Sequence, residues 1–245
     1  MNLLVTAGGT VVPIDRVRSI GNSFTGRTGA KIALHAHARG HRVTLLTSHP
    51  DVVTKFGAPA AHEPRWLLKP YRTFNDLHHE MAEQLTTAGF DAVIHSAAVS
   101  DYRVAGVFAP DAGTAFRNGA WGGERALRML DRSAGKVKSE DPELWLRLAR
   151  TPKLIDLVRT EWRFTGVVVK FKLEVDGGDE RLLEIAERSR VHSGSDLMVA
   201  NTLDGVATCA FLGPVGGKYE RVPRPELAAR LIAAVEEKHR ERTHG

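Results

Sequence analysis

The sequence predicts a doubly wound α/β fold, in which helices cover both faces of a mostly parallel sheet. Short apolar segments alternate along the chain with longer amphipathic ones, which is the pattern of repeated βαβ units. One segment, residues 91–99, is apolar almost throughout, as expected of a strand that is buried on both faces of a parallel sheet. The chain has 245 residues, of which 42% are hydrophobic, enough to build such a core.

The first half of the chain supplies the first strands and helices of this fold. Strands are expected at 2–7, 41–48, 63–70 and 91–99, and helices at 26–40 and 75–89. In the second helix Leu77, Met81 and Leu85 lie on one stripe, Asn75 can cap the start, and Gly89 can end it. The glycines that follow the strand 2–7 mark a tight turn at its carboxyl end.

The second half completes the sheet and adds an edge hairpin. Strands are expected at 165–173 and 196–200, a helix at 179–190, a C-terminal edge hairpin from 206–213 and 217–223, and a closing helix at 224–242. Residues 103–134 show no clear periodicity and follow directly on the strand 91–99. Ligands bind at the carboxyl edge of open α/β sheets, so this segment is expected to be a long lid or flap over the site. We expect a single domain, 1–245, that includes the lid.

Composition and charge restrict the class of protein. The net charge is only +5, from 34 basic and 29 acidic residues, and no run of Lys and Arg is interleaved with aromatics, so no nucleic acid is expected as partner. No apolar run approaches the ~20 residues of a membrane helix, and the N-terminus does not resemble a signal peptide. A lone cysteine, Cys209, cannot form an internal disulfide. These features predict a cytoplasmic protein that does not bind membranes.

Two glycine-rich turns are separated by some fifteen residues near the N-terminus. "AGGT" at 7–10 follows the first strand, and "FTGRTG" at 24–29 opens a helix whose N-terminus attracts phosphate. The two turns could hold different parts of one long ligand, such as a triphosphate and an acid. The glycines by themselves fit tight packing of strand against helix equally well, and Asn22 between them could be an ordinary turn residue.

Several segments, in order, resemble the phosphopantothenate–cysteine ligase (phosphopantothenoylcysteine synthetase) family. They are "LVTAGGTVVPIDRVRSIGNSFTGRTG" at 4–29, "SAAVSDY" at 96–102, "GKVKS" at 135–139, "TPKLIDLVRTEWRFTGVVVKFKLEVD" at 151–176 and "DLMVANTLDG" at 196–205. The fourth segment is closer to the eukaryotic-type branch, and no flavoprotein decarboxylase domain precedes the match. The resemblance therefore implies a Rossmann-like, stand-alone synthetase of coenzyme A biosynthesis.

The resemblance also implies a reaction and a set of residues. A nucleoside triphosphate activates the carboxylate of 4'-phosphopantothenate, pyrophosphate leaves, and the amine of cysteine then displaces the nucleotide monophosphate. Asn22 matches the residue that holds the activated acyl group, and Lys136 matches a lysine on the phosphates. The remaining implied residues are Gly8, Gly9, Thr10, Thr25, Gly26 and Arg27 on the phosphates, Phe171 and Asn201 near the base, and Ala97, Ala98 and Asp101 on the substrate.

The co-substrates and the assembly follow from the same resemblance. ATP or CTP is implied with Mg²⁺, which the triphosphate itself would carry, so no dedicated protein metal site is expected. Ser189 and Ser193 stand where the CTP-using branch has lysines, which favours ATP, and Phe24 replaces a small hydroxyl residue. The family is dimeric, which implies a homodimer with shared active sites.

Two alternatives remain open from the sequence. An NAD(P)-dependent short-chain reductase would carry a lysine four residues after a tyrosine, but Tyr71, Tyr102 and Tyr219 are followed at that distance by Asn75, Gly106 and Pro223. A non-catalytic nucleotide-binding homologue is the second alternative. A catalytic assay separates it from the ligase, because both proteins would bind nucleotide.

Overall fold

The computed structural model describes residues 1–60, 62–123, 128–175 and 177–244. Contacts divide the chain into two compact units. Unit 1 comprises Met1–Thr10, Ser23–Val99 and Lys153–Gly245, and unit 2 comprises Val11–Asn22 and Ser100–Pro152. Each unit is therefore built from segments that lie far apart in the sequence.

Unit 1 is built on one sheet, which has eight strands within the described residues, in the order β15-β14-β13-β12-β6-β1-β4-β5. Its strands are β1 (Asn2–Ala7), β4 (Arg42–Thr47), β5 (Trp66–Pro70), β6 (Ala92–His95), β12 (Val167–Glu174), β13 (Leu197–Thr202), β14 (Cys209–Val215) and β15 (Lys218–Pro223). The strands from β13 to β5 run parallel, and β14 and β15 form an antiparallel hairpin at one edge. Counted in chain order, the parallel strands follow the order 3-2-1-4-5-6 of the doubly wound dinucleotide-binding fold, whose switch point lies here between β1 and β6.

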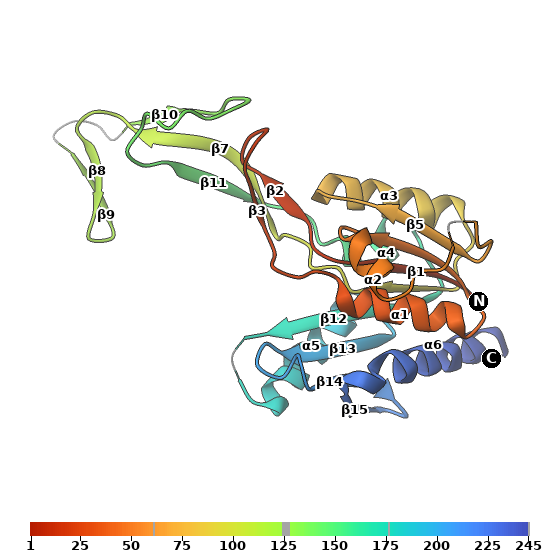
Figure 1. Cartoon of the computed structure of the whole chain (residues 1–245). Coiled ribbons are helices and arrows are strands. Elements are labelled where there is room, and N and C mark those ends of the chain that lie inside the picture. Colours follow the sequence, from red (N-terminus) through yellow and green to blue (C-terminus); the bar gives the residue numbers. More distant parts are fainter. Residues whose placement is uncertain (61, 124–127, 176, 245) are drawn as a thin grey trace. The chain divides into compact units, whose positions relative to one another are not determined.

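Helices pack on both faces of this sheet (Figure 1). They are α1 (Arg27–Ala38), α2 (Pro50–Lys55), α3 (Phe74–Thr87), α4 (Leu154–Thr160), α5 (Asp179–His192) and α6 (Leu227–His244), the last preceded by the 3₁₀ turn η1 (Arg224–Glu226). Helices α1, α2 and α6 share one apolar cluster with Leu3, Val5 and Val199 of the sheet. Helices α3, α4 and α5 cover the opposite face. Successive strand residues alternate between the faces, which explains why the central strands are apolar throughout.

Unit 2 consists of antiparallel strands. These are β2 (Val11–Pro13), β3 (Ser19–Gly21), β7 (Tyr102–Pro110), β8 (Thr114–Arg117), β9 (Ala120–Gly123), β10 (Met129–Asp131) and β11 (Trp145–Arg150). Strand β7 lies between β10 and β11, while β2 pairs with β3 and β8 pairs with β9. The rings of Phe116, Trp121 and Trp145 pack together with centroids 4.5–5.1 Å apart and attach the β8–β9 hairpin to β11.

The mostly parallel sheet and the edge hairpin are confirmed, whereas two local expectations are wrong. Residues 103–134, expected to be irregular, contain strands, although 124–127 of that segment lie outside the described residues. The partners of β7 are distant in sequence, whereas β8 and β9 form a local hairpin through Asn118 and Gly119, both of which have positive φ. Helix α3 is capped by Thr73 and not by Asn75: Asp76 N donates to Thr73 Oγ1 at 3.2 Å, and Thr73 N donates back to the Asp76 carboxylate at 2.8 Å. This reciprocal pair satisfies two backbone groups, which a cap at Asn75 would not do. The role of residues 103–134 as a lid stays a prediction.

Candidate functional site

The two glycine turns, separated in the sequence, meet in unit 1. Gly8 has φ +91° and Gly26 has φ +76°, a backbone conformation that favours glycine. A Cβ on Gly26 would lie 2.5 Å from Gly8 N, and one on Gly29 would lie 2.6 Å from the Ala7 side chain. The glycines therefore allow the first turn of α1 to sit directly on the end of β1. Tight packing is thus one of their functions, and it brings both turns to the switch point of the sheet.

Backbone groups of the first turn pair across this switch point. Gly9 bridges to Ala98 in parallel register, Thr10 N donates to Ala98 O at 3.2 Å, and Ala98 N donates to Gly8 O at 2.8 Å. Gly9 N donates to Ser48 Oγ at 2.9 Å. The N–H groups of Gly9 and Thr10, expected from the sequence to face an anion, are therefore used inside the protein. Ala98 therefore lies beside the glycines, with Ala97 next to it in the chain.

The first turn of α1 is the stronger anion-binding element. The N–H groups in the first turn of an α-helix have no partner within the helix, and α1 has no side-chain cap and no acidic residue in that turn. Thr25 precedes it and is exposed, and the Arg27 guanidinium lies 5.8 Å from the ring centre of Phe56. This end of the helix therefore carries positive potential without an internal carboxylate to offset it.

A second cation, Arg224, reaches the same turn from η1. Its guanidinium donates to Thr28 Oγ1 through Nη2, and among the described residues its buried Nη1 has no hydrogen-bond partner. Burial lowers the pKa of Arg224. A partly buried guanidinium with an unsatisfied N–H is costly unless it serves a ligand or a partner. Nothing in the sequence pattern singled out Arg224, because only the packing of the edge hairpin brings it to α1.

Phe171 and Asn201 stand on neighbouring strands at the carboxyl edge of the sheet. Phe171 pairs with Val199, two residues before Asn201, so both predicted side chains belong to the face that α1 covers. Asn201 is 7% exposed, and its Oδ1 has no partner among the described residues. A half-buried ring and an unsatisfied amide oxygen on this face of the sheet are suited to an aromatic, hydrogen-bonding group such as a nucleobase.

A buried histidine lies under the switch point. His95 Nδ1 lies 2.9 Å from Thr6 Oγ1, which also accepts from Ala97 N at 3.2 Å. An assignment in which the Thr6 hydroxyl donates its proton to Nδ1 satisfies both groups. Burial, with Lys170 nearby, lowers the pKa of His95 to about 4. The imidazole is therefore neutral at pH 7 and joins β6 to β1.

The remaining predicted residues, Asn22, Asp101 and Lys136, belong to unit 2. All three are exposed. Asn22 follows β3 directly, and the carbonyl of Asp101 accepts a hydrogen bond from Thr151 N at 2.9 Å. Unit 1 brings together the predicted phosphate and base residues, and unit 2 carries both residues expected to be catalytic.

Sequence reasoning missed an ionic contact that holds the Lys136 segment. Asp15 and Arg18, in the β2–β3 turn, pair at 2.7 Å, and both bind the backbone of Val137. Arg18 holds the pKa of the Asp15 carboxyl well below its usual range, with help from backbone N–H groups. The segment "PIDRVR" did indicate the local pair, because its aspartate precedes its arginine by three residues. It could not indicate Val137, which lies 119 residues away from Arg18.

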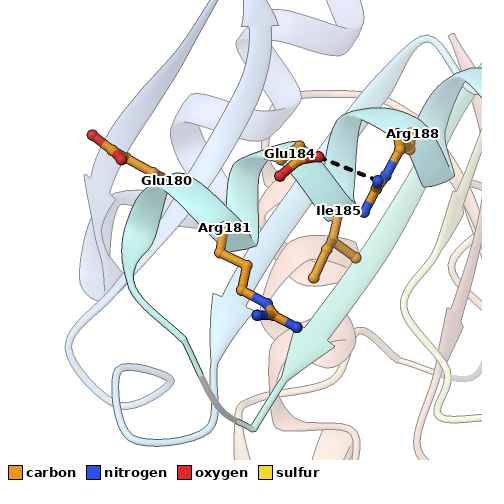
Figure 2. A pocket seen from close by; sticks show the side chains of 5 residues that line it. All are labelled: Glu180, Arg181, Glu184, Ile185 and Arg188. Carbon is orange, nitrogen blue, oxygen red and sulfur yellow. Dashed lines mark ion pairs between the residues drawn. The ribbon is translucent and has the colours of Figure 1, made fainter.

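Two surface hollows lie elsewhere, on α5. Figure 2 shows one of them, lined by Glu180, Arg181, Glu184, Ile185 and Arg188, with Arg188 paired to Glu184 at 3.2 Å. The other extends from Arg181 to the end of β12. Neither is lined by a residue that the sequence predicted for the site.

Within the ranges that the structure describes, no group of three or more His, Cys, Asp or Glu side chains is placed to hold a metal ion. In the same ranges, none of the helices combines the length and the apolar character needed to span a membrane.

Comparisons with known proteins identify relatives along most of the chain. Residues 1–110 match the family model of the DNA/pantothenate metabolism flavoprotein C-terminal domain. The coenzyme A biosynthesis bifunctional protein CoaBC of Thermococcus kodakarensis is 31% identical over 239 residues, covering 96% of this chain and 50% of its own. CoaBC of Escherichia coli is 26% identical over 201 residues, covering 82% of this chain and 41% of its own. This chain thus spans about half the length, or less, of these curated relatives.

Solved structures extend the likeness to the fold. The crystal structure of the DNA/pantothenate metabolism flavoprotein from Streptococcus pneumoniae has a TM-score of 0.75 at 28% identity, and the match covers 97% of this chain and 99% of that one. A histidine-to-alanine mutant of Cab2, in complex with phosphopantothenate-cysteine, has a TM-score of 0.71 at 20% identity, covering 98% and 86%. Together with the ordered motifs, these matches show that the chain is similar along most of its length to the CoaBC proteins and to the DNA/pantothenate metabolism flavoproteins.

Proposed function

We propose that this chain joins 4'-phosphopantothenate to L-cysteine through an acyl-nucleotide, as a ligase of coenzyme A biosynthesis. The observation that carries the proposal is the meeting of the two glycine turns at the switch point, on the same face of the sheet as Phe171 and Asn201. This arrangement suits a nucleotide, and the names of the relatives connect it with coenzyme A biosynthesis. The Cab2 complex with phosphopantothenate-cysteine supports the same choice of substrates.

The nucleotide is proposed to bind along the carboxyl edge of unit 1. Its phosphates lie on the first turn of α1, near Thr25, Gly26 and Arg27, with Arg224 as an added cation. Gly8, Gly9 and Thr10 shape the floor of this site, because the N–H groups of Gly9 and Thr10 are already used. The base lies against Phe171 and accepts or donates hydrogen bonds at Asn201.

The chemistry is proposed to occur in two displacement steps. An oxygen of the phosphopantothenate carboxylate attacks the α-phosphorus and pyrophosphate leaves; the cysteine amine then attacks the acyl carbon and the nucleotide monophosphate leaves. Asn22 donates a hydrogen bond to the developing oxyanion, since an amide can donate without itself ionising. Lys136 stabilises the charge on the leaving pyrophosphate, and Ala97, Ala98 and Asp101 contact the acid substrate.

The proposed co-substrate is ATP, with Mg²⁺ carried on its phosphate oxygens, where the ion offsets their charge. CTP is the second candidate. Ser193 is buried just after α5, with its Oγ 2.8 Å from Ser195 Oγ. A serine supplies no positive charge at this position, where the CTP-using branch has a lysine.

The proposed assembly is a homodimer with shared active sites. Light scattering measures the mass, and mixing two inactive variants, Asn22→Asp and Asp101→Asn, tests the sharing. Mixed dimers should regain up to half of the wild-type activity if the two residues serve one site from different chains. A fully active monomer would refute the dimer, and a dimer without recovery would refute only the sharing.

The ligase reaction is tested by mixing the protein with phosphopantothenate, cysteine, Mg²⁺ and either ATP or CTP. We expect pyrophosphate and the nucleotide monophosphate to appear in equal amounts, faster with ATP. Tight nucleotide binding without pyrophosphate would instead support a non-catalytic homologue. Omitting cysteine provides the control, because the reaction should then stop after the first step, at the acyl-nucleotide.

A further inference from the structure

The two carboxylate oxygens of Asp15 have different partners. Oδ1 accepts from Val17 N at 2.8 Å and from Arg18 N at 2.7 Å, and so closes the β2–β3 turn. Oδ2 accepts from the Arg18 guanidinium at 2.7 and 3.1 Å and from Val137 N at 3.0 Å. The Asp15 side chain has 0% exposure. One oxygen therefore builds the local turn, while the other reaches a segment 122 residues away in the chain.

The same turn binds the distant segment at two further points. Arg18 Nη2 donates to Val137 O at 2.6 Å, so Val137 is held through both its N–H and its carbonyl. Arg16 N donates to Gly135 O at 3.0 Å. Lys136 therefore lies between two residues whose backbones are fixed, while its own side chain is exposed. Val137 is only 3% exposed, so its own backbone groups are shielded from solvent, whereas the Arg18 side chain is 44% exposed.

We propose that Asp15 and Arg18 are positioning residues for Lys136, presenting its ammonium group from a rigid backbone. The inference rests on the proposed role of Lys136 at the phosphates. A lysine on a flexible four-carbon stem stabilises a developing charge well only if its Cα is fixed, because a displacement of about 1 Å can cost on the order of 10²-fold in rate. The hairpin that carries Asp15 and Arg18 also leads directly to Asn22, so one hydrogen-bonded framework supports both proposed catalytic residues.

We call the hydrogen bonds from Asp15 and Arg18 to the Val137 backbone the clamp. Asp15→Asn should weaken this clamp and leave the β2–β3 turn intact. The asparagine Oδ1 can still accept from Val17 N and Arg18 N, while its Nδ2 places a donor against the donors Val137 N and Arg18. Asp131→Asn is the matched control. Asp131 also lies in unit 2 and accepts from Ser133 N at 2.7 Å, but its hydrogen bonds do not reach 135–137.

The first readout does not depend on activity. Trypsin cleaves after Lys136, and cleavage requires the backbone at 136–137 to leave its hydrogen bonds. In Asp15→Asn we expect cleavage at this bond to be at least tenfold faster, with the melting transition of the protein still cooperative. The Asp131→Asn control should be cleaved there at the wild-type rate. Equal rates in wild type and Asp15→Asn would overturn the clamp.

The second readout asks whether Asp15 acts through Lys136. We expect Asp15→Asn to lower kcat for pyrophosphate release by ~10²-fold and to leave the nucleotide Kd unchanged. In a Lys136→Ala background the same change should cost nothing further, because residues that act through one group are not additive. Additive losses would overturn the positioning role. A wild-type protein that releases no pyrophosphate with either nucleotide would refute the proposed function instead, and the trypsin result would still decide the clamp.

Discussion

The stability of this protein should depend on pH between 5 and 7 through one buried side chain, His95. Its pKa is lowered from 6.5 to about 4, first by burial and then by Lys170. As the pH falls through 6.5, the histidine binds a proton in the unfolded chain but not in the folded one. The contribution to stability is therefore complete above pH 6.5 and is lost as the pH falls towards 4. The difference between the two pKa values of His95 corresponds to roughly 3 kcal/mol of the free energy of unfolding. About 2 kcal/mol of this is lost by pH 5.

Urea denaturation followed by circular dichroism at pH 7.5, 6.5, 5.5 and 5.0 measures this loss. His95→Asn keeps an acceptor for Thr6 Oγ1 but does not titrate, so its free energy of unfolding should be lower at pH 7.5 and nearly flat down to pH 5. His79→Gln is the control, since His79 is exposed on α3. Carboxylates such as Glu187, whose pKa is lowered to about 2 by Arg190, lose their contribution mainly below pH 5. Parallel curves for wild type and His95→Asn would refute the reasoning.

The other predictions concern the site. Asn22→Asp should lower the rate of product formation by ~10²–10³-fold, because it replaces a donor with a carboxylate that repels the substrate; wild-type turnover would remove Asn22 from the mechanism. Lys136→Ala should slow pyrophosphate release without lowering the melting temperature, and a lost cooperative transition with unchanged specific activity would make the lysine structural. Arg224→Gln should weaken nucleotide binding, measured by calorimetry, about tenfold or more, the loss expected for a charge-assisted hydrogen bond; an unchanged Kd would place Arg224 outside the site. Gly26→Ala should destabilise the protein more than Gly57→Ala, although both have positive φ, because only the Gly26 Cβ would clash, at 2.5 Å from Gly8 N, and equal losses in urea would contradict this.

The parts of the fold that depend on local pattern could be predicted from the sequence. Apolar strands, amphipathic helices and the edge hairpin all carry their signal within a few residues, and the predicted sheet is confirmed. The glycines after the first strand also indicated a tight turn, which the structure contains at the end of β1. The order of the strands in the sheet could not be predicted in the same way, because the sequence indicates parallel pairing but not which strands are neighbours.

The tertiary structure decided the features that depend on contacts between distant residues. Asp15 meets Val137 and Arg224 meets Thr28, although 122 and 196 residues separate them. Strand β7 pairs with β10 and β11 across long stretches of sequence, whereas β8 and β9 form a local hairpin. Even the N–H groups of Gly9 and Thr10 looked free in the sequence, and only the folded chain brings Ser48 Oγ and Ala98 O to accept from them. A residue's type limits which bonds it can make, but its partner is set by the packing of the whole chain, which brings such distant groups within hydrogen-bond distance.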